Sequence, residues 1–226
     1  RINNFDVRWE MFQPKGEMWS VGAFFKTFEN LIEIVQFLSD PGSFQPRNVG
    51  NGTVLGVELE FRKSLKFISS SLEKFQWNTN LTLTESQITM SATEQRSRKL
   101  TAREGEEVGT TRDMSGQAPY IINTGIAYSD FNTGWEAGIY YNVQGPTLNM
   151  VGFGNRTDTY AVPFNSLNLN INKTFGADER IRASFGVQNL LNDKREFIFS
   201  SYGAQDQFFT QLAPGVRANF SLGFSF

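Results

Sequence analysis

The chain ends on the sequence GVRANFSLGFSF, which occupies residues 215–226. From Val216 to Phe226 every even-numbered residue is apolar, and from Gly215 to Ser225 every odd-numbered residue is small or polar, apart from the charged Arg217. Successive side chains of a β-strand point to opposite faces, so the segment predicts a strand with one apolar face and one polar face.

The same alternation recurs in eight other segments, at residues 3–12, 18–27, 54–63, 75–87, 120–129, 135–143, 166–172 and 181–188. Phe24 is an exception to the pattern within 18–27. Most of the predicted strands are about nine to twelve residues long, whereas strands of globular proteins have about five or six and tilted membrane-spanning strands about nine to eleven. The pattern therefore predicts an all-β fold, an antiparallel transmembrane β-barrel.

The connections between the predicted strands alternate in length. Short connections at 13–17, 129–134 and 175–179 contain turn-forming Gly, Pro, Asn or Asp, and the connection at 64–74 is somewhat longer. Long connections lie at 28–53, 88–116, 144–165 and 190–214. Outer-membrane barrels have short periplasmic turns and longer extracellular loops, so a chain that ends at the periplasmic side would have all four long loops outside the cell.

The two faces of the predicted strands suit lipid on one side and water on the other. Tyr120 and Tyr128 lie eight residues apart on one face, close to the spacing expected of the two aromatic girdles of a membrane barrel. The opposite face is polar, and we expect its members to face an aqueous lumen: Glu58, Glu60, Arg62, Asn123, Asn142 and Asn170. We expect Arg62 and Lys63 to balance the two glutamates in part, and a soluble β-sandwich or lipocalin-like barrel remains the alternative fold.

Composition excludes several classes of function. The chain has no His and no Cys, which rules out histidine-dependent catalysis, thiolate nucleophiles, disulfides and zinc sites of the usual kind. A net charge of −2 argues against nucleic-acid binding. Residues 1–6 do not resemble a signal peptide, because no apolar stretch follows them, and no apolar run is long enough for a transmembrane helix. We predict no catalytic residue, cofactor or metal site.

Nine strands is an odd number, and single-chain bacterial barrels have even numbers. A free edge at residues 3–12 would leave backbone groups unpaired in lipid. We therefore expect residues 1–226 to be the C-terminal portion of a larger barrel domain.

Ordered motifs along the whole chain resemble the barrel of TonB-dependent receptors of the Bacteroidetes type. The resemblance rests on these segments: NFDVRWEMF at 4–12, GE at 16–17, VGAFFK at 21–26, GVELEFRKSL at 56–65, GQAPYIIN at 116–123, YYN at 140–142, NLLN at 189–192 and the terminal Phe226. It implies a 22-stranded barrel with an N-terminal plug, and active uptake of an external ligand powered through TonB, which contacts the plug region. It also implies outer-membrane lipid as a partner, and an assembly signal on the last strand at Phe220, Leu222, Phe224 and Phe226.

Two of the long connections carry candidate contacts. Residues 88–116 hold five basic and five acidic residues, so we expect a solvated or mobile loop, with ligand gating or partner contact as the functional reading. Residues 152–157 begin like a dinucleotide fingerprint but predict only a loop tip. Residues 190–214 hold several aromatics, of which Tyr202, Phe208 and Phe209 are the candidate ligand contacts. Such aromatics stack on sugars or pack against a surface lipoprotein; the reading we favour is that they extend the strands above the membrane.

The ligand cannot be read from the sequence, because siderophores, cobalamin, glycans and peptides all use this architecture and a fold does not fix a function. Two other functions stay open: a passive porin or surface adhesin, and an outer-membrane barrel enzyme such as a protease or lipase. The lack of His and Cys argues against the enzyme within this chain. A soluble sugar-binding sandwich ranks last.

Overall fold

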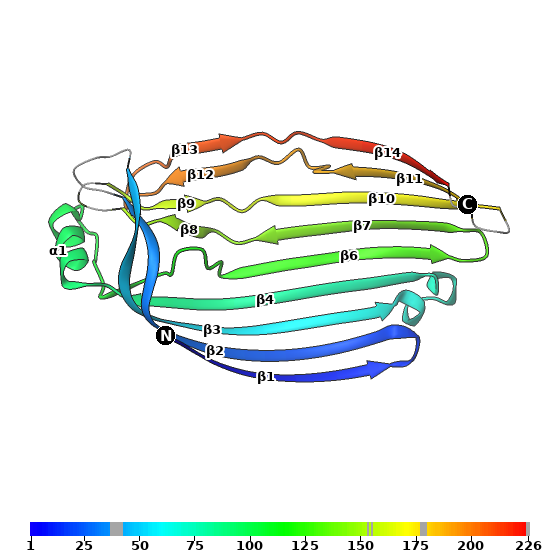
Figure 1. The fold of residues 1–226 in the computed structure, drawn as a ribbon, viewed down its shortest axis with the longest axis horizontal. Helices are drawn as coiled ribbons and strands as arrows, with labels where there is room; N and C mark the ends of the chain where they lie inside the picture. The colour runs from blue at the N-terminus through cyan, green and yellow to red at the C-terminus, as the bar shows by residue number, and fades with distance from the viewer. Residues whose placement is uncertain (37–42, 153, 155, 177–179, 225–226) are drawn as a thin grey trace.

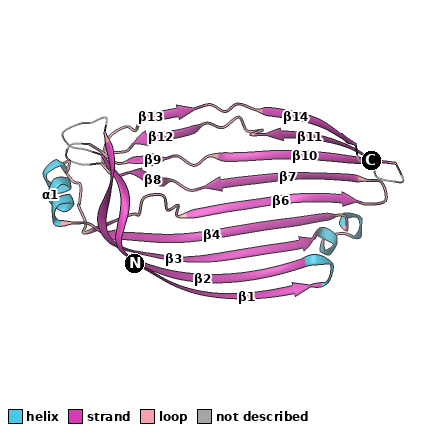
Figure 2. Cartoon of the chain, in the orientation of Figure 1, coloured by secondary structure: helices cyan, strands magenta, loops and turns pink. Residues whose placement is uncertain are grey.

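A single long sheet runs through the chain in the computed structural model, which describes residues 1–36, 43–152, 154, 156–176 and 180–224 (Figures 1 and 2). Nine antiparallel strands pair in the order β1-β2-β3-β4-β6-β7-β10-β11-β14, and the short strand β5 pairs with β4. Their bounds are β1 (Ile2–Gln13), β2 (Glu17–Gln36), β3 (Phe44–Ser64), β4 (Phe75–Thr89), β5 (Thr111–Arg112), β6 (Tyr120–Asp130), β7 (Trp135–Gln144), β10 (Asn165–Phe175), β11 (Ile181–Gln188) and β14 (Arg217–Phe224). All nine strands predicted from the alternation are present.

Each strand pairs with its neighbour along the chain, so the sheet is a meander closed by short turns at one end (Figure 1). The first turn is a 3₁₀ segment, Pro14–Gly16, in which Lys15 and Gly16 take positive φ angles of 65° and 74°. Gly134 also has a positive φ of 70°, and a Cβ there would lie 2.5 Å from the carbonyl oxygen of Thr174. Glycine is required where the backbone makes this contact.

Register fixes which side chains share a face. Residues directly opposite each other in an antiparallel pair point the same way, so Phe5, Phe25 and Leu55 lie on one face while Glu10, Ser20 and Glu60 lie on the other. Phe24 lies on the polar face, where its ring occupies the space that a side chain at Gly56 would fill. This close packing explains why Phe24 breaks the alternation.

The four long connections lie at the opposite end, as expected, but they contain strands and a helix, so the expectation that they are loops is wrong. Strands β2 and β3 extend well past the predicted bounds of 18–27 and 54–63, and residues 88–116 contain a helix, α1 (Ala92–Thr101). The two remaining connections form a second sheet in the order β13-β12-β9-β8, from β8 (Thr147–Met150), β9 (Thr159–Ala161), β12 (Arg195–Phe199) and β13 (Gln207–Leu212). Within residues 190–214, β12 and β13 confirm the interpretation that these residues extend the strands.

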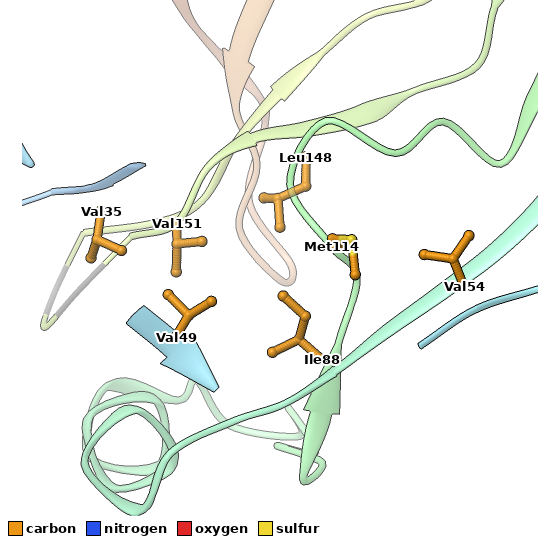
Figure 3. Close-up of a cluster of buried hydrophobic side chains, with 7 residues drawn as sticks. All are labelled: Val35, Val49, Val54, Ile88, Met114, Leu148 and Val151. Carbon is orange, nitrogen blue, oxygen red and sulfur yellow. The ribbon is translucent and has the colours of Figure 1, made fainter. Parts of the chain in front are cut away.

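We call the part of the chain at this end the distal unit; it comprises the β2–β3 tip beyond Phe28 and Gly52, residues 88–116 and the second sheet. Its apolar core draws on segments far apart in sequence (Figure 3). Ile88 at the end of β4 is fully buried, and Val35, Val49, Met114, Leu148 and Val151 are each less than 10% exposed. A bridge between Val35 and Val151 joins the β2 tip to the residue after β8.

Ile88→Ala is expected to loosen the distal unit while leaving the nine-strand sheet intact. Deleting most of a fully buried Ile side chain costs about 2–5 kcal/mol, and Ile88 lies in the cluster where β2, β3 and β8 meet. Hydrogen exchange on the full-length protein should show faster exchange in residues 88–116 and 147–151. Leu100→Ala is the matched control, because Leu100 on α1 is 79% exposed; equal exchange in the two variants would contradict the assignment of Ile88 to a core.

Candidate functional site

A row of polar side chains crosses the middle of the sheet. The pairing places Ser20, Glu60, Asn80, Asn123, Asn142 and Ser166 side by side on six neighbouring strands. Within the row, Nδ2 of Asn142 donates a hydrogen bond to Oδ1 of Asn123 at 2.7 Å. The row gives the polar face a continuous strip of hydrogen-bonding groups.

All six residues expected to face the lumen lie on this polar face. Glu58 is opposite Gly22 and Thr82, Arg62 is opposite Met18 and Asn78, and Asn170 is opposite Gly138 and Gly186. The structure brings Asn123 and Asn142 into direct contact. Asn170 lies two strand positions further toward the turn end than Asn168, which faces Tyr140.

The charge balance on this face differs from the expectation. Glu60 accepts a hydrogen bond from Nη2 of Arg8 at 2.9 Å, and Arg8 also pairs with Glu10 at 2.6 Å. Lys63 lies on the opposite face and pairs with Glu17 at 2.6 Å, so the expectation that it balances the glutamates is wrong. Lys63 lies five positions from Glu58 and three from Glu60, and an odd difference in position along a strand puts two side chains on opposite faces.

The second face is apolar, and large apolar side chains are exposed on strands across the sheet. Val7, Trp9, Leu55, Ile139 and Phe220 are all at least 40% exposed. Such an extended apolar surface is far larger than soluble monomers expose, and it suits contact with lipid hydrocarbon.

Aromatic side chains gather on the apolar face near the turn end. The rings of Trp19 and Phe61 lie 4.4 Å apart, Phe61 and Trp77 4.9 Å, and Phe75 and Tyr128 4.9 Å. Tyr120 pairs with Leu83 while Tyr128 pairs with Phe75, which confirms that both tyrosines lie on one face at different heights. A band of aromatics at one level is typical of the membrane interface.

The last strand contributes three exposed apolar side chains to the same face. Phe220, Leu222 and Phe224 pair with Phe185, Ala183 and Ile181, and each is more than half exposed. Phe226 lies outside the described residues. Their role in barrel assembly stays a prediction.

A network of ion pairs joins three of the four long connections in the distal unit, 28–53, 88–116 and 144–165. Arg112 at β5 donates to Glu33 on the β2 tip at 2.7 Å and to Glu94 on α1 at 2.7 Å. Arg98 on α1 donates to Glu94 at 3.2 Å and to Asp158, just before β9, at 3.0 Å. The second oxygen of Glu33 accepts the backbone N–H of Ser115 at 2.7 Å, and Asp158 accepts that of Gly152 at 2.8 Å.

The expectation that residues 88–116 form a solvated or mobile loop is wrong for these groups, because the side chains of Arg112, Glu33 and Glu94 are 7%, 3% and 8% exposed. Burial acts to lower the pKa of Arg112, but its hydrogen bond to Glu33 and the charge of Glu94 outweigh burial and raise the pKa. Arg98 behaves in the same way: burial acts to lower its pKa, but the charge and hydrogen bonds of Asp158 outweigh burial, so the pKa is raised. The arginines therefore stay charged and hold the segments together. No local motif signals the network, because Glu33 and Arg112 are 79 residues apart.

A cavity of about 730 Å³ lies beside this network. Its walls come from α1, from residues 101–112, from residues 152, 154, 156–158 and 160, and from residues 200–202. They carry the charged side chains of Glu94, Arg98, Arg103, Glu106, Glu107, Arg112, Arg156 and Asp158. Tyr160 also lines it, and burial raises the pKa of that tyrosine to about 12, so its hydroxyl is neutral. Acidic and basic groups are equal in number, so the cavity attracts neither anions nor cations strongly.

The structure places the three candidate ligand contacts of residues 190–214 in two different positions. Tyr202 lines the distal cavity and is half exposed. Phe208 and Phe209 lie on β13 away from it, and the ring of Phe209 packs edge-on against Phe199 at 5.2 Å. Gly152 and Gly154 line the cavity from the tip between β8 and β9, where a loop tip was predicted; Phe153 and Asn155 of that motif lie outside the described residues.

Two further cavities open on the polar face. One of about 160 Å³ is lined by Asn78, Asn80, Asn123, Tyr140 and Asn142 among others, and one of about 610 Å³ continues from Asn123 and Asn142 to Phe164 and Phe197. Tyr140 was not among the predicted site residues. Across the described residues no group of three or more acidic side chains is placed to hold a metal ion.

The model of the family described as "TonB dependent receptor-like, beta-barrel" matches residues 1–190. The chain belongs to the TonB-dependent receptor β-barrel family. No curated protein sequence matches it.

Solved structures share the fold of this receptor barrel at low sequence identity. The unliganded ferric citrate transporter FecA aligns with a TM-score of 0.67 at 12% identity over 98% of the chain. The copper transporter OprC aligns with a TM-score of 0.66 at 15% identity over 100% of the chain. The ferric yersiniabactin uptake receptor FyuA from Yersinia pestis aligns with a TM-score of 0.59 at 14% identity over 99% of the chain. The chain covers 31%, 32% and 30% of those proteins, about a third of their length.

TonB-dependent receptor barrels lie in the outer membrane of Gram-negative bacteria, and this barrel section has the same location. No helix in the described part of the chain is long and apolar enough to cross a membrane.

Arg112→Met is expected to open the distal unit. Removing one partner of a buried ion pair costs about 3–5 kcal/mol, because the remaining charges, here Glu33 and Glu94, stay buried without compensation. Limited proteolysis of the full-length receptor in detergent should cut residues 88–116 faster in this variant than in the unchanged protein.

Lys66→Met provides the control for this substitution, because Lys66 pairs with Glu73 at a turn where both side chains are more than half exposed. An exposed pair contributes about 0–1 kcal/mol. Cleavage of Arg112→Met at the rate of Lys66→Met would show that the network does not hold the distal unit.

Proposed function

We propose that this chain is the C-terminal section of a plugged, 22-stranded outer-membrane transporter that takes up a ligand with energy delivered through TonB. The observation that carries the proposal is a nine-strand meander with one exposed apolar face and one hydrogen-bonding face, in a chain that belongs to this receptor family. The sheet covers about a third of a solved transporter, which fits a section of a larger closed barrel.

The orientation follows from the two ends of the sheet. The described chain stops at the end with short turns, and α1 and the second sheet stand at the other (Figure 1). Short turns on the periplasmic side and longer segments outside are typical of outer-membrane barrels. In the proposed orientation the distal unit faces the medium and its cavity is the first part of this section to meet a ligand.

Roles follow for the residues predicted from sequence. Glu58, Glu60, Arg62, Asn123, Asn142 and Asn170 would line the lumen, and Tyr202 would contact ligand at the distal cavity. Phe220, Leu222, Phe224 and Phe226 would form the assembly signal. Lipid would cover the apolar face, the TonB energy complex would act through the plug region, and a surface lipoprotein could pack on the distal unit. The Bacteroidetes type stays a prediction.

A transporter of this kind forms and breaks no covalent bonds in its ligand. The solved neighbours are named as transporters and an uptake receptor. A passive porin or adhesin would use the same wall without a plug. A barrel enzyme would need catalytic groups that this chain, without His or Cys, supplies poorly.

The test measures accumulation of four labelled probes by cells that express the full-length receptor: ferric citrate, cobalamin, maltohexaose and a hexapeptide. We expect one probe to accumulate only when receptor and TonB are both present, and a protonophore to abolish its accumulation. Accumulation of a probe without TonB would support the passive porin instead, and hydrolysis of a probe outside the cells would support the enzyme.

A further inference from the structure

Lys173 is a charged residue on the apolar face of the sheet. The strand pairing sets it opposite Trp135 on β7 and Ala183 on β11, and Ile171 precedes it on the same face. It lies two residues before the end of β10 at Phe175, beside the short turns. The side chain is therefore placed where the apolar face meets the turn end of the sheet.

The rest of a closed barrel would leave this position on the outside. Strands β7 and β10 each pair with a neighbour on both edges, so further strands can join this sheet only beside β1 and β14. A plug would lie in the lumen, on the side of the polar face. Lys173 therefore faces away from both the plug and the remaining strands.

Three groups surround the ammonium of Lys173. Its Nζ lies 5.1 Å from the centre of the Trp135 ring and 5.5 Å from the centre of the Phe175 ring, and each of these two residues is 45% exposed. Nζ also donates a hydrogen bond to the carbonyl oxygen of Thr133, which takes one of the three donors of the ammonium. On the side of β11, the methyl group of Ala183 is too short to cover the charge.

The turn that supplies the Thr133 carbonyl is held against β10. The backbone N–H of Thr174 donates to the carbonyl oxygen of Gly134 at 2.8 Å, and the N–H of Gly134 donates to that of Asp130 at 2.8 Å. The acceptor that positions Lys173 is therefore part of a fixed turn.

The charge of Lys173 is balanced differently from that of other lysines nearby. Three lysines near the turn end each pair with a carboxylate: Lys63 with Glu17 at 2.6 Å, Lys66 with Glu73 at 3.4 Å and Lys74 with Asp130 at 2.7 Å. Within the described residues, Lys173 forms no ion pair with a carboxylate and bonds a neutral carbonyl. A cation at the edge of hydrocarbon loses part of its hydration, so an anion that reaches it from the lipid side is stabilised there.

We propose that Lys173, Trp135 and Phe175 form a binding site for the phosphate of an anionic phospholipid head group. Such a lipid supplies the negative charge that Lys173 lacks, and its acyl chains would lie along Ile139 and Ile171 on the same face. Tryptophan rings lie at the level of the head groups in membranes, which places the phosphate beside Nζ. The inference rests on the orientation in the proposed function, which assigns this lipid to the periplasmic leaflet.

The test is photolabelling of the purified full-length receptor in detergent. The probe is a phosphatidylglycerol with a diazirine on the acyl chain next to the head group, and mass spectrometry of peptides locates the label. We expect saturable labelling of residues 133–139 and 167–175. Lys173→Met should weaken binding at this site about fivefold, which corresponds to about 1 kcal/mol, the contribution of one lysine at an anionic membrane surface.

Two variants and a second probe make the result specific. Lys173→Arg keeps the charge and should be labelled like the unchanged receptor. Lys66→Met also removes one positive charge from the turn end, but on an exposed turn, and should leave labelling at 133–139 and 167–175 unchanged. A diacylglycerol with the same diazirine chain and no phosphate should label these residues weakly. Heat-modifiable migration on a gel confirms that each variant is a folded barrel.

Three outcomes would overturn the site. These are equal labelling by the two probes, equal labelling of Lys173→Met and Lys66→Met, and loss of the label in millimolar inorganic phosphate, which would assign the position to a soluble anion.

Uptake measured on the same receptor separates this site from the transport proposal. TonB-dependent uptake in a receptor without phosphatidylglycerol at Lys173 would overturn the lipid site alone. Labelling that depends on Lys173, in a receptor without TonB-dependent uptake, would overturn the transport proposal alone.

Discussion

Backbone hydrogen bonding between neighbouring strands is the constraint on which the rest of this structure depends. Hydrocarbon offers no partner for an N–H or C=O group, so a strand that crosses a membrane must pair along both of its edges. The strands between β1 and β14 in the sheet meet this requirement, because each of them pairs with one strand on either side, whereas β1 and β14 pair along one edge within the described residues. Since the ladder alone satisfies the backbone, the side chains are left to suit the medium on each face.

The two faces and the distal unit use side chains in different ways. The apolar face exposes large apolar side chains on many strands and carries aromatic pairs near the turn end. The polar face carries rows of amides with glycines between them, and Tyr140 fills the space that the glycines leave. The distal unit resembles a small soluble domain, with a buried apolar cluster and arginines that connect remote segments through carboxylates.

The sheet could be predicted from sequence because its signal is local. Period-two alternation predicts all nine strands. The same alternation predicts that Glu58, Asn123 and Asn170 lie on the polar face, and the strand pairing agrees. The side of the strand on which Lys63 lies can also be read from the sequence, since a residue next to Arg62 must point the other way.

The distal unit could not be predicted in the same way. Glu33 and Arg112 meet across 79 residues, and charge counting over residues 88–116 cannot separate a buried pair from a solvated one. The extensions of β2 and β3 contain polar residues and lack strict alternation, because they pack against other segments and not against lipid. Tyr140 was missed for a related reason: its orientation depends on Gly125, which lies on a different strand.

The most direct test of the two-faced wall is a spin-label accessibility scan of residues 55–60 on β3, in the full-length receptor reconstituted in lipid bilayers. Labels are attached to single cysteines after removal of any cysteine elsewhere in the receptor; this chain contains none. Labels at Leu55, Val57 and Leu59 should collide with oxygen dissolved in lipid, and labels at Glu58 and Glu60 with a water-soluble nickel chelate. Oxygen contact at Glu58 and Glu60, with Leu55, Val57 and Leu59 shielded from it, would contradict the account.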